Sequence, residues 1–241
     1  MKEIENKKIR ITKLDIYILV FVSEMKFVNA EQIGEKFFEG KGLRYPKKRL
    51  KDFVDNDLLF SVLEWGGKKL NYLITENGTK LVQRKGFDVV PFGMKGIDLK
   101  NHDHDKLLTS IRIKLEKKKI VDSWTSERII RNRNLYLRVN DKDKIIPDAY
   151  CRSVDKDSDL IIEFENSRKS NDRIKKLLKN YQFYFAISKN INEKVLFFFV
   201  SDALLSSYKQ IYADSKFTFP IQFIAIKDLG LEQNLQEYRR I

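Results

Sequence analysis

The sequence predicts an α+β protein made of two domains, and three observations support this prediction. Apolar residues recur at helical spacing through most of residues 12–57. Two strand-like runs, Leu59–Trp65 and Lys68–Ile74, then flank Gly66-Gly67, a pair that a tight hairpin turn accepts. Beyond residue 101, strand-like runs alternate with helical ones, which is typical of a mixed sheet packed against helices.

Three helices are expected before the hairpin. The first, Thr12–Met25, begins with a threonine that can cap it, and the second, Ala30–Phe38, follows Asn29, which can do the same. A third helix should begin near Pro46, because proline is tolerated at the first helical position, and end near Asn56.

A fourth helix, Glu76–Arg84, should follow the hairpin directly, with Thr75 as its cap. Three helices, a hairpin and a closing helix within about 75 residues are the outline of a winged helix-turn-helix module, which we place at residues 1–85. Residues 86–101 contain glycine and proline without a clear period, so we expect a linker there.

The second domain, residues 102–241, is expected to alternate helices with strands. The predicted helices are Asp103–Lys118, Arg173–Ile187 and Ala203–Ala213. The predicted strands are Ile120–Ile130, Ile145–Cys151, Asp159–Glu165, Val195–Val200 and Phe219–Ile226.

Composition favours a polyanionic partner and a reducing compartment. The 241 residues include 47 Lys and Arg against 34 Asp and Glu, and the net charge of +13 is shared as +6 in residues 1–100 and +7 beyond. The alternative is charge that serves solubility alone. The first apolar run, Ile16–Val22, is too short for a signal or a membrane span, and the single Cys151 can form no intrachain disulfide, so we expect a cytoplasmic protein without membrane contact.

The third helix and its approach are strongly basic. Between residues 41 and 51 there are six cationic side chains and no acidic one. We predict that they contact DNA together with two lysines at the hairpin tip; the full set is Lys41, Arg44, Lys47, Lys48, Arg49, Lys51, Lys68 and Lys69. The alternative is a solvated helix face.

Three carboxylates in the second domain could converge. Asp148 ends the run Ile145-Ile146-Pro147-Asp148, and Glu163 and Glu165 share one face of the next strand, because side chains alternate along a strand. Asp148 and Glu163 are candidate ligands of Mg²⁺ or Mn²⁺, and all three acids are candidate catalytic residues for phosphodiester cleavage.

This motif, together with the predicted order of helix, three strands, helix and strand, resembles the PD-(D/E)xK restriction-endonuclease-like fold. In that family the proline-aspartate strand and the acid of the next strand bind magnesium, and a lysine two positions later contacts the reacting phosphate or water. Glu165 occupies the lysine position here, although Lys144, Lys169 or Lys175 could substitute. Because a carboxylate repels phosphate, the sequence favours a nuclease fold that is used for binding, or ordinary solvated acids, over an active enzyme.

The chain is also similar to the replication-relaxation proteins of plasmids and other mobile elements. The residues that carry this resemblance are His102-Asp103-His104-Asp105-Lys106-Leu107, Trp124, Glu127, Ile146-Pro147-Asp148-Ala149, Ile162-Glu163-Phe164-Glu165-Asn166-Ser167 and Lys176-Leu177-Leu178-Lys179-Asn180-Tyr181. The resemblance implies DNA binding linked to replication, mobilisation or gene control. His102 and His104 could be metal ligands or general bases, or residues that cap and pack a helix start.

The sequence therefore predicts a protein that binds double-stranded DNA with sequence selectivity. Two alternatives stay open: a metal-dependent endonuclease or nickase that the first domain targets to DNA, and a recruitment protein whose second domain binds other proteins. A homodimer that matches a palindromic site is also left open, because no heptad pattern identifies an interface.

Overall fold

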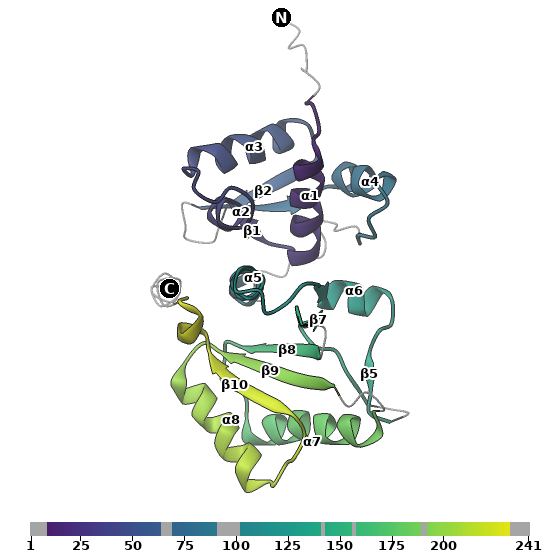
Figure 1. The fold of residues 1–241 in the computed structure, drawn as a ribbon, viewed down its shortest axis with the longest axis vertical. Coiled ribbons are helices and arrows are strands. Elements are labelled where there is room, and N and C mark those ends of the chain that lie inside the picture. The colour runs from purple at the N-terminus through teal and green to yellow at the C-terminus, as the bar shows by residue number, and fades with distance from the viewer. Residues whose placement is uncertain are drawn as a thin grey trace, which may run out of the picture. The chain divides into compact units, whose positions relative to one another are not determined.

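The computed structural model describes residues 9–63, 69–90, 102–140, 143–155, 158–188 and 192–231. Within these ranges the protein is a mixed α+β structure with eight α-helices and a mixed five-stranded sheet (Figure 1). The chain divides into two compact units, residues 1–113 and residues 114–241.

The first unit begins with three helices, α1 (Lys13–Met25), α2 (Ala30–Phe37) and α3 (Arg44–Asp55). The predicted caps of α1 and α2 are confirmed. Oγ1 of Thr12 accepts a hydrogen bond from the backbone of Asp15, whose carboxylate accepts one from the backbone of Thr12, and Asn29 and Gln32 form the same reciprocal pair. α3 begins two residues earlier than predicted and has no side-chain cap.

Three short antiparallel strands and two further helices complete this unit. They are β1 (Val28–Asn29), β2 (Leu59–Leu63), β3 (Leu70–Ile74), α4 (Glu76–Arg84) and the first turns of α5 (His102–Lys117). The strand order is β1-β3-β2, so the expected hairpin pairs with one additional strand. The predicted cap Thr75 accepts a hydrogen bond from the backbone of Gly78 at 2.9 Å. The turn at Gly66-Gly67 lies outside the described residues.

α5 is attached to α1 and α2 by buried polar contacts. The side-chain amide of Gln32 donates to the carbonyl of Lys106 and to the hydroxyl of Ser110, both at 2.9 Å. Arg112 pairs with Glu24 at 2.6 Å. These contacts explain why the compact unit extends to residue 113, whereas the sequence places the start of the second domain at residue 102. Of the expected linker, residues 91–101 lie outside the described part of the chain.

The second unit is built on the five-stranded sheet, in the order β10-β9-β8-β7-β4. Its elements are β4 (Thr125–Ser126), α6 (Glu127–Asn132), β5 (Leu137–Arg138), β6 (Lys144–Ile145), β7 (Ala149–Arg152), β8 (Asp159–Glu165), α7 (Asn171–Ile187), β9 (Glu193–Phe199), α8 (Asp202–Asp214), β10 (Ile221–Ala225) and a 3₁₀ turn, Ile226–Leu229. Strands β8, β9 and β10 run parallel, and α7 and α8 are the crossovers that join them. Strands β4, β7 and β8 pair antiparallel.

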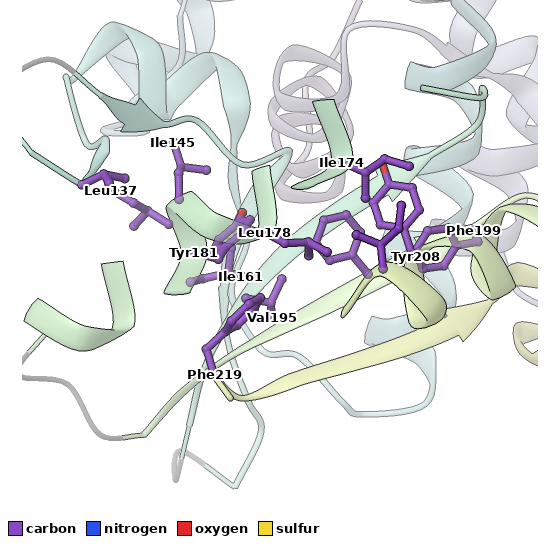
Figure 2. Close-up of a cluster of buried hydrophobic side chains, with 13 residues drawn as sticks. Leu137, Ile145, Ile161, Ile174, Leu178, Tyr181, Val195, Phe199, Tyr208 and Phe219 are labelled. Carbon is purple, nitrogen blue, oxygen red and sulfur yellow. The ribbon is translucent and has the colours of Figure 1, made fainter. Parts of the chain in front are cut away.

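The core of this unit lies between the sheet and the layer formed by α7 and α8 (Figure 2). α7 contributes the stripe Ile174, Leu178 and Tyr181, which the helical spacing predicts. β9 is buried along almost its whole length, as expected for a parallel strand with neighbours on both sides. Cys151, the single cysteine, is a buried free thiol in β7.

Two strand predictions in this unit are wrong. The expected strand Ile120–Ile130 is reduced to Thr125–Ser126, and Glu127 begins helix α6, where it forms an ion pair with Arg131 one turn later at 2.6 Å. The expected strand Ile145–Cys151 is divided into β6 and β7, with Pro147 between them, because proline has no N–H to donate to a strand ladder.

Candidate functional site

α3 separates an apolar face from a cationic one. Pro46, Leu50 and Phe53 are buried in the first unit and hold the helix against α2 and β2. The cationic residues Lys41, Arg44, Lys47, Lys48 and Lys51 are all exposed. This helix can therefore pack and present positive charge to a partner at the same time.

A groove of about 530 Å³ runs between α3 and the β2–β3 hairpin. Three of the predicted cationic residues line it: Lys47 and Lys51 from α3, and Lys69 from the start of the hairpin's second strand. The other lining residues are Ala30, Glu31, Val54, Asp55, Ser61, Leu70 and Tyr72. The fold thus brings together charges that lie about 20 residues apart in the sequence. Lys68, the other expected hairpin cation, lies outside the described residues.

One of these lysines, Lys51, forms an ion pair with an acidic neighbour on the same helix. Asp55, one turn along α3, accepts a hydrogen bond from Nζ of Lys51 at 2.6 Å, and this bond raises the pKa of Lys51. Both side chains are largely exposed, so the pair contributes little to stability and can exchange Asp55 for an external anion. Lys51 therefore remains positively charged at every physiological pH.

A second concave surface of about 390 Å³ lies beside α3 and contains Lys48, Arg49 and Arg10. Four of the predicted cations of α3 therefore divide between two hollows, with Lys47 and Lys51 in the first and Lys48 and Arg49 in the second. Lys41, which comes before the helix, lies over the ring of Tyr45 at 4.6 Å from its centre, a cation–π contact that leaves the ammonium group accessible.

Arg49 has an internal role that sequence reasoning missed. Its Nε and Nη2 donate to the two carboxylate oxygens of Asp15 at 2.7 and 2.5 Å, and it also donates to the carbonyl of Arg10. Burial alone would raise the pKa of Asp15, but the hydrogen bonds from Arg49 and Thr12 outweigh it and hold this pKa below its ordinary value. Arg49 therefore joins α3 to the start of α1.

In the second unit, Asp148, Glu163 and Glu165 form what we call the carboxylate cluster. Oδ2 of Asp148 accepts a hydrogen bond from the backbone N–H of Phe164 at 2.8 Å, just beyond the last pair of the β7–β8 ladder. Glu163 and Glu165 are buried and lie on the same face of β8, toward tyrosines of α7 and α8. Sequence alternation predicts this shared face.

Each glutamate of the cluster already has a partner inside the protein. The hydroxyl of Tyr181 donates to Glu163 at 2.5 Å, and Lys169 forms an ion pair with Glu165. Burial, and then the charge of Asp148, raise the pKa of Glu163 well above its ordinary value despite the bond from Tyr181. Glu163 therefore holds its proton more strongly than an ordinary carboxyl group does.

These contacts do not match a metal centre. A divalent cation would require ionised carboxylate oxygens that converge on one point. Among the described residues, no group of three or more His, Cys, Asp or Glu side chains is arranged to hold a metal ion. The cluster instead consists of carboxyl groups paired with a tyrosine, a lysine and a backbone amide. Of the three substitute lysines considered from the sequence, Lys169 is the one in contact with the cluster.

The two histidines belong to the first unit. The ring of His102 packs edge-on against Phe27, with the ring centres 4.8 Å apart, and its Nδ1 lies 3.4 Å from Asp103. Nδ1 of His104 lies 3.7 Å from Asp105. These contacts correspond to the packing alternative at the start of α5.

Comparisons with models of protein families, with curated proteins and with solved structures found no match to this chain. No helix in the described part of the chain has both the length and the apolar character needed to cross a bilayer.

Proposed function

We propose that this chain binds double-stranded DNA through its first unit, which we interpret as a winged helix-turn-helix module. In this interpretation α3 is the recognition helix and the β2–β3 hairpin is the wing. The observation that carries the proposal is the groove in which Lys47, Lys51 and Lys69 meet, on the exposed side of a helix whose opposite face is buried.

The dimensions and charge of this surface suit a duplex. An α-helix fits the major groove of B-DNA, which is about 12 Å wide, and lysines beside it neutralise the phosphates on the rims. Arg44 lies in the first turn of α3, the part of a recognition helix that contacts base edges. Because arginine can donate two parallel hydrogen bonds to guanine, Arg44 is our candidate for sequence readout, whereas the lysines set affinity.

We further propose a role for the second unit in binding rather than in cleavage. Its parallel strands, crossover helices and carboxylate cluster agree with a restriction-endonuclease-like interpretation, but the partners of Glu163 and Glu165 favour a structural use of the acids. A role in replication, mobilisation or gene control of a plasmid or mobile element follows from the family resemblance and is proposed on that basis.

The test replaces Lys47, Lys48 and Lys51 with Ala and measures binding to duplex DNA by fluorescence anisotropy. We expect affinity to fall roughly tenfold or more, because about three phosphate contacts are lost. The matched control replaces Lys80, Arg84 and Lys85 of the first unit with Ala. It removes the same charge, also from exposed positions, and it likewise breaks one exposed ion pair within a helix, Lys80–Glu76 in place of Lys51–Asp55.

Both variants should unfold close to the wild-type temperature, because exposed lysines contribute little folding energy. Equal affinities for the two triple variants would contradict the assignment of α3, and a wild-type chain without duplex affinity would contradict the proposed function as a whole.

A further inference from the structure

A second concentration of positive charge lies on the first half of α7 and just before it, in the second unit. Residues 168–179 contain six cationic side chains and one acidic one, Asp172. The cations are Arg168, Lys169, Arg173, Lys175, Lys176 and Lys179, and all except Lys169 are exposed. Lys169 lies at the near end of this run, where it pairs with Glu165.

The packing of α7 forces these charges outward. Ile174, Leu178 and Tyr181 point into the core between α7 and the sheet (Figure 2), so the intervening lysines occupy the outer side of the helix. Within the described residues, Lys175, Lys176 and Lys179 form no ion pair with an acidic side chain, and Lys179 lies 5.6 Å from the ring centre of Phe183. This charge is therefore not used to hold the unit together.

Solubility alone does not explain where the charge is placed. α8 covers the same face of the sheet as α7 (Figure 1) and contains one lysine and two aspartates over Asp202–Asp214. If cations served only to keep the unit dissolved, both outer helices could carry mixed charge, as α8 does. Of these two outer helices, α7 instead carries four cationic side chains and α8 carries one.

We propose that the exposed face of α7 is a second, sequence-independent contact for the phosphate backbone of duplex DNA. The face offers the guanidinium and ammonium groups that bind phosphates, and the apolar stripe Ile174, Leu178 and Tyr181 is buried. The exposed large apolar residues of α7, Phe183 and Ile187, lie beyond Lys179 toward the C-terminal end of the helix. This inference rests on the proposed function, because it takes duplex DNA as the partner.

The length of the patch sets the size of the expected effect. Residues 173–179 span about 9 Å of helix, at about 1.5 Å per residue. One DNA strand presents a phosphate about every 3.4 Å along its axis, so this span faces about three phosphates. Each phosphate that the protein neutralises adds about 0.9 to the slope of log affinity against log salt concentration.

The experiment compares the salt dependence of duplex binding for the full chain and two triple variants. One replaces Lys175, Lys176 and Lys179 with Gln, and the matched control replaces Lys118, Arg138 and Lys209, which are exposed cations elsewhere in the second unit. We expect the α7 variant to lower the slope by about 2–3 and the control to leave it nearly unchanged. Replacing the same three α7 lysines with Arg should preserve the slope, because the charge is kept.

Equal slopes for the α7 and control variants would overturn the inference. If the triple variant of α3 loses affinity while the α7 variant behaves like its control, the proposed function stands and this inference alone fails. A wild-type chain that does not bind duplex DNA would remove both. Loss of binding to phosphatidylserine vesicles in the α7 variant, with an unchanged DNA slope, would instead assign the face to an anionic membrane and would also overturn the inference.

Discussion

Replacing Arg49 with Ala should destabilise the first unit while leaving the lysines of the proposed DNA-binding surface in place. The side chain of Asp15 is only 4% exposed, and the variant removes two of the four hydrogen bonds that reach its carboxylate. Breaking a fully buried ion pair from one side costs about 3–5 kcal/mol. Because Arg49 itself is 21% exposed, water can partly replace it, and we expect a loss of about 2–3 kcal/mol in the free energy of unfolding.

This loss corresponds to a fall of roughly 10–20 °C in the unfolding temperature of a unit of this size. Thermal unfolding followed by circular dichroism measures it, with Lys48→Ala as the exposed control on the same helix. Since the pKa of Asp15 is lowered in the folded state, the stabilisation is present above the ordinary carboxyl pKa of about 4 and disappears as the pH falls through the folded value. The difference between wild type and variant should therefore narrow in acid.

An unfolding temperature within about 2 °C of wild type, together with a loss of DNA affinity as large as that of the triple lysine variant, would rule out a structural role for Arg49. Arg49 would then be a DNA contact, as its position in the basic run first indicates.

Two further predictions concern the carboxylate cluster. Because the pKa of Glu163 is raised in the folded state, its contribution to stability is present below its unfolded pKa and is lost as the pH rises through the folded value. The unfolding temperature of wild type should thus fall more steeply than that of Glu163→Gln as the pH rises above the ordinary glutamate pKa of about 4.3, and parallel curves would contradict the assignment. With Mg²⁺ or Mn²⁺ present, wild type should nick supercoiled plasmid no faster than Asp148→Ala; cleavage that Asp148→Ala abolishes would show that the acids do assemble a metal site.

Local patterns predict most of the helices and strands of this fold. Thr12, Asn29 and Thr75 are recognisable caps, and the stripe from Ile174 to Tyr181 has unambiguous helical spacing. These signals lie within a few residues of the element they define. The strand predicted over Ile120–Ile130 was wrong, because the β-branched residues of this segment favour a strand. In the structure a helix of six residues begins at Glu127, and one ion pair, Glu127–Arg131, supports it.

The candidate sites depended on contacts that no local pattern encodes. Arg49 has the same appearance in the sequence as its neighbours Lys47 and Lys48, yet its partner Asp15 lies 34 residues earlier. Tyr181 lies on the apolar stripe of a helix that the sequence predicts, but its hydroxyl bond to Glu163, 18 residues away, requires the packing of α7 on β8. A sequence can thus indicate which residues carry charge, while the fold determines which of those charges are available to a partner.

Hydrogen exchange of the full chain, with and without duplex DNA, shows whether α3 and the hairpin meet the duplex. We expect slower exchange of the backbone amides in residues 41–55 and 69–72 when DNA is added, because α3 and the described start of β3 line the proposed DNA-binding groove. Unchanged exchange in these segments, at DNA concentrations that saturate binding, would instead place the DNA contact elsewhere on the protein.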